Sequence, residues 1–170
     1  MAYTYSKISS VTVGSGGLPT VNFIAIPQNY TDLLIFMSVR GTANFASAGN
    51  VSYIKPNGSS DGLSRKIIYG IGTSAGSDPG SDWAAYITPS DYTANTFSNS
   101  SVYIPNYTGS ANKSVSIDAV NENNATAAQM LLEAGLWSNT PSITSLEFSL
   151  AAGNFAQYST FTLYGIKAEV

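Results

Sequence analysis

The chain has 170 residues, a net charge of −3, and charged side chains at only 10% of its positions. This composition gives no basic stripe of the kind that nucleic-acid binders carry. The chain contains no cysteine and no histidine, which excludes disulfides, iron–sulfur clusters and thiolate chemistry, and removes the commonest general base and transition-metal ligand. The length favours one domain, residues 1–170.

The N-terminal residues, Met-Ala-Tyr-Thr-Tyr-Ser-Lys, lack the basic and apolar regions of a secretory signal peptide. Apolar runs such as Leu33 to Met37 are far shorter than a membrane span. We therefore expect a protein that is made in the cytoplasm, without a secretory leader and without a membrane-spanning segment.

Short apolar runs alternate with Gly, Ser, Asn and Pro along the whole chain, which is typical of β-sandwiches and barrels. The predicted strands, in chain order, are Tyr5–Val13, Thr20–Ile26, Asp32–Arg40, Val51–Lys55, Leu63–Tyr69, Val102–Ile104, Lys113–Val120, Ala125–Trp137, Ile143–Leu150 and Gln157–Lys167. Trp83–Thr88 is a further, weaker candidate for a short strand. We expect an all-β fold, an antiparallel β-sandwich of about nine or ten strands. A jelly roll is the leading topology, partly on the resemblance given below, and an immunoglobulin-like sandwich is the alternative.

The last predicted strand, Gln157–Lys167, is apolar on both faces. Phe161 and Leu163 share one face, and Tyr164 and Ile166 lie on the other. A strand with two apolar faces belongs inside a sheet, so we expect the rest of the chain to fold around this one.

The sequence is less decisive about the secondary structure of three segments. Ala125–Trp137 contains many helix formers, but its neighbours and Gly135 favour a strand over a helix. Val51–Lys55 and Leu63–Tyr69 flank a Gly- and Ser-rich turn and suggest a hairpin with a long loop. Gly70–Asp82 is rich in Gly, Ser and Asp, which predicts an exposed, mobile loop.

No catalytic motif or cofactor site emerges. Asp78, Asp82 and Asp91 could supply oxygen ligands to calcium, but their spacing does not match a calcium-binding loop, and Asp is common in turns. Two carboxylates of the predicted strands, Asp118 and Glu147, fall on solvent faces, which does not suit the facing pair that glycoside hydrolysis needs. We expect no enzyme, no metal and no cofactor.

Aromatic residues are the more informative set, because the chain has 11 tyrosines and two tryptophans. Several of them fall in polar segments that we expect to be exposed: Tyr30, Trp83, Tyr86, Tyr92, Tyr103 and Tyr107. Exposed amphipathic rings suit protein interfaces or stacking on sugar faces, although tyrosines also cap the edges of sandwiches. These six residues are the predicted interface or glycan contacts.

Four segments, two of them near the ends of the chain, resemble a known group of proteins. The segments Tyr5–Gly17, Ile26–Leu34, Asp118–Glu122 and Ser159–Lys167 resemble small virion proteins of tailed bacteriophages, including phages of aquatic bacteria. The resemblance spans most of the chain and consists of strand residues and turns. It implies a β-sandwich structural protein, and it transfers no functional residue.

Together these observations predict a non-enzymatic virion protein, a capsid decoration, fibre or tail-appendage subunit. We expect a homo-oligomer, with a trimer favoured, that contacts other capsid or tail proteins. The alternative is a receptor-binding module of the virion that recognises host-surface glycan through loop aromatics such as Trp83, Tyr86 and Tyr92.

Overall fold

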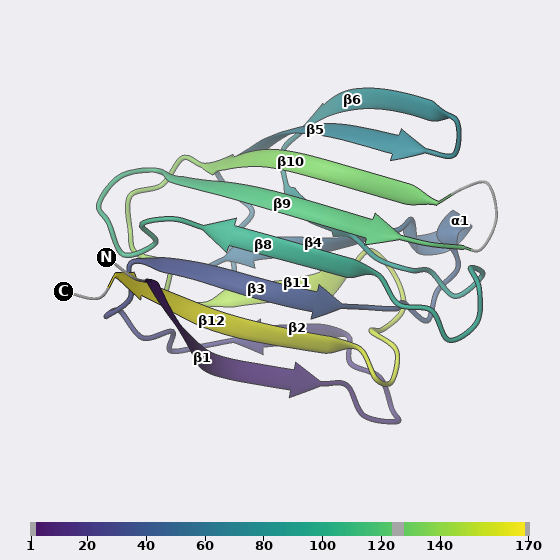
Figure 1. Cartoon of the computed structure of the whole chain (residues 1–170), viewed down its shortest axis with the longest axis horizontal. Helices are drawn as coiled ribbons and strands as arrows, with labels where there is room; N and C mark the ends of the chain where they lie inside the picture. Colours follow the sequence, from purple (N-terminus) through teal and green to yellow (C-terminus); the bar gives the residue numbers. More distant parts are fainter. Residues whose placement is uncertain (1–2, 124–127, 169–170) are drawn as a thin grey trace.

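The computed structural model describes residues 3–123 and 128–168, which form a β-sandwich of two antiparallel sheets (Figure 1). The larger sheet has eight strands in the order β1-β12-β3-β8-β9-β10-β5-β6, and the smaller sheet has four in the order β2-β11-β4-β7. The elements of the described residues are β1 (Tyr3–Thr12), β2 (Thr20–Phe23), β3 (Asp32–Ser38), α1 (Phe45–Ala48), β4 (Val51–Pro56), β5 (Leu63–Ile71), β6 (Ser74–Gly80), β7 (Trp83–Tyr86), β8 (Asn99–Ile104), β9 (Lys113–Asn121), β10 (Gln129–Trp137), β11 (Leu146–Leu150) and β12 (Thr160–Ala168).

Eight of the strands follow the jelly-roll order. The set β1-β12-β3-β8 lies side by side in the larger sheet, and the set β2-β11-β4-β7 forms the whole of the smaller one. Within these eight, every connection crosses between the sheets except the one from β4 to β7. This is the arrangement of a jelly roll built from two Greek keys. The predicted all-β sandwich with jelly-roll topology is confirmed.

The remaining four strands widen the larger sheet. The β5–β6 pair is inserted between β4 and β7, and the β9–β10 pair between β8 and β11. They extend the sheet beyond β8, where β7 of the smaller sheet packs beneath β9, β10 and β5. The prediction of about nine or ten strands was too low, because the described residues form twelve.

The core confirms the predicted role of the last strand. β12 pairs with β1 on one side and β3 on the other, so it lies inside the larger sheet. Phe161 and Leu163 are fully buried. The ring of Phe161 contacts those of Phe155 and Phe148, at centroid distances of 5.0 and 5.4 Å. These aromatic contacts join the larger sheet to β11 of the smaller one.

The segment 70–82 is not the exposed loop that its composition predicts. Ser74–Gly80 forms strand β6, which pairs with β5 after a tight turn at Gly72, where φ is 57°. Backbone hydrogen bonds to β5 do not depend on strand-forming side chains. An edge strand also tolerates Gly and Pro, because one side of its ladder remains free.

Two other predictions about strands were wrong. β4 and β5 do not form a hairpin, because β4 pairs with β11 and β7 in the smaller sheet, whereas β5 pairs with β10 and β6 in the larger one. The last strand begins at Thr160 and not at Gln157, since Tyr158 adopts a left-handed φ of 72° that breaks the extended backbone.

The preference for a strand over a helix near residue 130 is confirmed for Gln129–Trp137, which is β10. The predicted start of that segment, Ala125 to Ala127, lies outside the described residues. Among the described residues, no helix has the length and apolar character to cross a membrane.

Gly135 lets the smaller sheet approach β10 closely. A Cβ atom at this position would lie 2.5 Å from Val115 Cγ1 and 2.6 Å from the indole nitrogen of Trp83, which is fully buried. We expect Gly135→Ala to lower the free energy of unfolding by about 1–3 kcal/mol, because the indole must shift in a filled core. Urea denaturation measures this. Gly14→Ala is the control, because Gly14 has open space around its Cβ position and should tolerate alanine.

Candidate functional site

Strand β10 turns its more apolar side chains away from the core. Its inward residues are all buried: Gln129, Leu131, Glu133, Gly135 and Trp137. Its outward residues are all exposed: Met130, Leu132, Ala134 and Leu136. A sheet with one solvated face normally places polar residues on that face. β10 instead buries a carboxylate and exposes three large apolar side chains.

The two strands beside β10 extend this surface. Ile68 of β5 lies opposite Leu132, and Val120 of β9 lies opposite Met130. These four side chains and Leu136 form what we call the outer apolar face, and their exposed fractions run from 38% at Leu136 to 62% at Met130. Together they expose on the order of 400 Å², which is the size of the largest apolar patch on a typical soluble monomer, and such patches are often functional.

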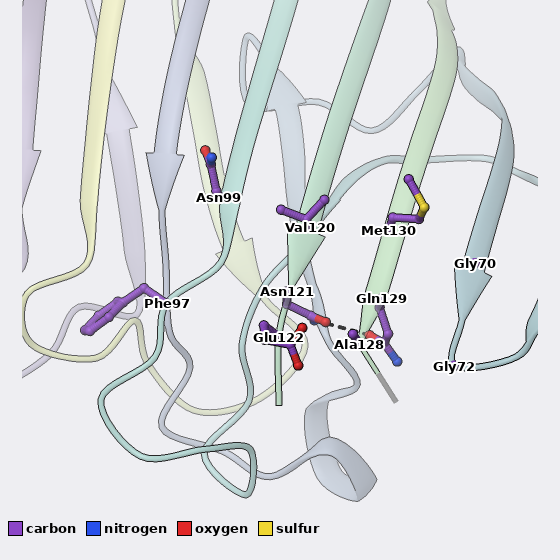
Figure 2. Close-up of a pocket in the computed structure, with 10 residues that line it drawn as sticks. All are labelled: Gly70, Gly72, Phe97, Asn99, Val120, Asn121, Glu122, Ala128, Gln129 and Met130. Carbon is purple, nitrogen blue, oxygen red and sulfur yellow. Dashed lines mark hydrogen bonds between the residues drawn. The ribbon is translucent and has the colours of Figure 1, made fainter. Parts of the chain in front are cut away.

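The outer apolar face is hollowed along β10. A central hollow of about 720 Å³ lies over β5, β6, β9 and β10, where Gly70 and Ala75 leave space beside the larger side chains. It shares residues with a hollow of about 390 Å³ at the end of β9 and with one of about 330 Å³ near Ala134. Figure 2 shows the first of these ends, with Val120 and Met130 side by side on β9 and β10. We call the continuous depression the trough.

Two opposite charges flank the trough on different strands. Lys66 of β5 is exposed and lies across from Ala134 of β10. Asp118 of β9 is exposed, lies across from Leu132, and accepts a hydrogen bond from the hydroxyl of Ser101. The surface is therefore apolar along its middle strand, with one cation and one anion on the two sides.

A buried carboxylate lies on the core side of the same strand. Glu133 is fully buried, 3.5 Å from Arg65 Nη1, while Arg65 Nε lies 3.3 Å from Asp82. The Glu133 carboxylate also accepts long hydrogen bonds of 3.4 Å from the backbone N–H of Ala84. Burial raises the pKa of Glu133 to about 8, and Arg65 offsets only part of that rise. This group faces the core, so it cannot act on a ligand in the trough.

Three of the predicted aromatic contacts are not exposed. Trp83 and Tyr86 belong to β7, which is sandwiched under the extended sheet, and both are buried. Tyr107 is fully buried, with its hydroxyl donating to the carbonyl of Pro27. The expectation of exposure was wrong for these three residues, because isolated aromatics in polar segments read as surface residues although here they fill the core.

The other three predicted aromatic contacts are partly buried and lie apart from the trough. Tyr30 packs against the core, with its ring where a Cβ of Gly165 would lie. Tyr103 is on the outer side of β8, and its hydroxyl donates to Asp32 at 2.9 Å. Tyr92 stacks on Phe45 with a centroid distance of 6.4 Å. The structure therefore does not gather the six aromatics into one site.

The segment that carries Tyr92 is held by one partly buried cation. The Arg40 guanidinium donates to the backbone carbonyls of Ser90, Tyr92, Thr93 and Thr96, at distances of 2.8 to 3.0 Å. Burial lowers the pKa of Arg40, although Asp91 counteracts this in part. These four hydrogen bonds from Arg40 therefore fix the conformation of the loop.

The acidic residues considered for calcium are scattered. Asp78 is on β6, Asp82 contacts Arg65, and Asp91 accepts from the N–H of Phe45 at 2.9 Å. Within residues 3–123 and 128–168, no three His, Cys, Asp or Glu residues are grouped so that they could hold a metal ion.

Sequence reasoning did not identify the outer apolar face. The alternation in Gln129–Trp137 does separate Met130, Leu132 and Leu136 from their neighbours. However, either face of the strand could be buried on that pattern, and nothing in the sequence says which one lies outward.

Comparisons with known proteins add little to this picture. No family model matches the chain, and no curated protein matches it significantly. Among solved structures, the chain is similar to a fructofuranosidase from Schwanniomyces occidentalis complexed with fructosylnystose, with 11% identity and a TM-score of 0.27. The match covers 98% of this chain and 33% of that one, and at this TM-score it carries no argument about fold or function.

Proposed function

We propose that this chain is a non-enzymatic structural subunit of a tailed-bacteriophage particle, a capsid decoration, fibre or tail-appendage protein that works through protein–protein assembly. The observation that carries this proposal is the outer apolar face, a hollowed apolar surface on a jelly-roll scaffold. Jelly rolls recur in viral capsid proteins, but also in lectins and cupins, so the fold is compatible with this role and does not select it.

The arrangement of carboxylates supports a structural role over glycoside hydrolysis. Asp118 lies outside the larger sheet, and Glu133 is buried on the opposite side of that sheet. Glu147 is on β11 of the smaller sheet and pairs with Lys55 at 3.0 Å. Hydrolysis needs two carboxylates on either side of one sugar. These three carboxylates therefore face different environments, and they do not form a facing pair.

Recognition of glycan by loop aromatics has lost most of its support. Of the three residues expected to stack on sugars, Trp83 and Tyr86 are buried, and only Tyr92 is partly exposed. A single partly exposed ring offers little surface for stacking on a sugar. The hydrogen bond from Arg40 to the carbonyl of Tyr92 stabilises the loop and leaves the ring uninvolved.

The proposal predicts that the chain copurifies with phage particles. Particles purified by density gradient from an infected culture should contain the chain at a fixed ratio to the major capsid or tail protein, measured by quantitative mass spectrometry. Labelling with an antibody against the chain, viewed by electron microscopy, should decorate one repeating location. Particles that lack the chain, or contain it at a ratio that varies between preparations, would contradict the proposal.

A further inference from the structure

We infer that the outer apolar face binds a second copy of this chain, face to face, around a two-fold axis that runs parallel to β10. This inference rests on the proposed assembly function and names the surface and the partner for it. The geometry favours a two-fold pair over the trimer expected from the sequence.

The size and composition of the surface fit a pair of identical subunits. The exposed side chains of the outer apolar face lie on three adjacent strands, and the trough widens the contact onto Ala75 and Gly76 of β6. A standard interface buries roughly 800 Å² on each partner, and the central region of homodimer interfaces is rich in apolar residues. The outer apolar face supplies about half of that area, and the outward residues of β8 and β6 on either side would supply the rest.

The surface is complementary to itself in shape. Two packed sheets lie about 10 Å apart with nearly aligned strands. With the axis over β10, β5 of one copy faces β9 of the other. Gly70 then lies opposite Val120 of the second copy, since both residues are level with Met130. The hollow left by Gly70 and Ala75 therefore receives the exposed side chain of Val120 from the other copy.

The surface is also complementary to itself in charge. The same axis brings Lys66 of one copy near Asp118 of the other. Lys66 is level with Ala134 and Asp118 with Leu132, so the two are offset by two residues along the strands. Because the contact is two-fold, this pair forms twice. Complementary charges of this kind set the register of an interface more than its affinity.

A two-fold axis across the strands at Leu132 is disfavoured. That arrangement would place each residue in the row of Leu132 against its own copy, and Asp118 lies in that row. Two carboxylates would then face each other in an apolar contact, which repels and leaves both charges partly desolvated. The axis parallel to β10 avoids this.

Site-specific crosslinking tests the axis directly, because the chain has no cysteine of its own. Leu132→Cys places one thiol beside the proposed axis, opposite its own copy. With a short bismaleimide, we expect most of this variant to migrate as a covalent dimer. Phe36→Cys is the matched control, since Phe36 is 48% exposed on the same sheet face but lies on β3, three strands from β10. It should give no dimer above background.

Sedimentation velocity tests the contact without a crosslinker. The native protein should show a concentration-dependent dimer. Leu132→Glu should raise the dissociation constant of the dimer about 100-fold or more, since the symmetric contact carries the substitution twice. Phe36→Glu should leave the dissociation constant nearly unchanged. Lys66→Glu should also raise the dissociation constant, and adding Asp118→Lys to that variant should return it toward the native value. Circular dichroism melting curves confirm that each variant is folded.

Two outcomes overturn the inference. The first is a native protein that remains monomeric at high concentration. The second is crosslinking that is equally efficient, or equally absent, at positions 132 and 36. Particle content separates this result from the proposed function: a monomer that copurifies with particles contradicts the two-fold contact alone, whereas a dimer that is absent from particles contradicts the virion role alone.

Discussion

Phe161→Ala is expected to lower the free energy of unfolding by about 3–5 kcal/mol. The Phe161 ring is fully buried between Phe155 and Phe148, and it contacts both sheets of the sandwich. Alanine would remove that contact and leave a cavity that the surrounding strands cannot fill, because β12 is paired on both sides. The loss therefore includes both the transfer of the ring and the cavity.

Urea unfolding followed by tryptophan fluorescence measures this loss, since both tryptophans are buried in the fold. Phe36→Ala provides the control, because Phe36 lies on the outer side of the same sheet and is about half exposed. It should cost less than about 1 kcal/mol, as surface substitutions usually do. Equal losses at the two positions would mean that β12 does not carry the core as described.

Glu133→Gln is expected to remove a fall in stability between about pH 4.5 and pH 8. In the unfolded chain the carboxyl has its ordinary pKa of 4.5, whereas burial raises the pKa in the fold to about 8. Between these values the folded protein holds a proton that the unfolded chain has released. The free energy of unfolding of the native protein must therefore fall as pH rises through this range, and the loss is complete above the folded pKa.

The pKa shift sets an upper limit on the order of 3–5 kcal/mol for this loss. The amide side chain of the Glu133→Gln variant would keep an acceptor for the backbone N–H of Ala84 and would carry no charge into the core, while Arg65 keeps its contact with Asp82. The variant should therefore be more stable than the native protein at pH 9 and similar to it at pH 4. Urea unfolding at several pH values measures both profiles.

Glu147→Gln serves as the comparison, because Glu147 is partly exposed and pairs with Lys55 across β4 and β11. It should keep the pH dependence of the native protein. If the native protein and Glu133→Gln showed the same pH profile, Glu133 would have to be ionised in the fold and held by Arg65, contrary to our expectation.

The sequence was informative wherever one face of a strand is clearly apolar. The alternation in Lys113–Val120 correctly placed Val115 and Ile117 in the core and Asp118 in solvent. β12 was correctly placed inside a sheet because both of its faces carry apolar side chains. These patterns are local, because successive side chains of a strand point to opposite faces and the sequence alone shows which residues share a face.

The failures had different physical causes. β6 was missed because pairing at a sheet edge needs backbone groups and not side chains, so Ser74–Gly80 carries no strand signal. The orientation of β10 could not be predicted because it depends on the tertiary fit between Gly135 and Trp83. Trp83 and Tyr86 were misplaced for the same reason, since their burial depends on β7 lying under the two inserted strand pairs. Tyr107 was misplaced because its burial depends on a contact with Pro27, which is 80 residues away in the sequence.

The jelly-roll pairing has a consequence for how the chain folds. β1 and β3 both pair with β12, and β2 pairs with β11, so strands from the first part of the chain find their partners only near its end. The meander β8-β9-β10 and the β5–β6 hairpin are the exceptions, because their strands follow one another in sequence. Contacts between distant residues slow folding, since a long loop must close before any of them forms. We therefore expect the meander to form first and the closing of the β1-β12-β3 half to limit the folding rate, which hydrogen exchange during refolding would resolve strand by strand.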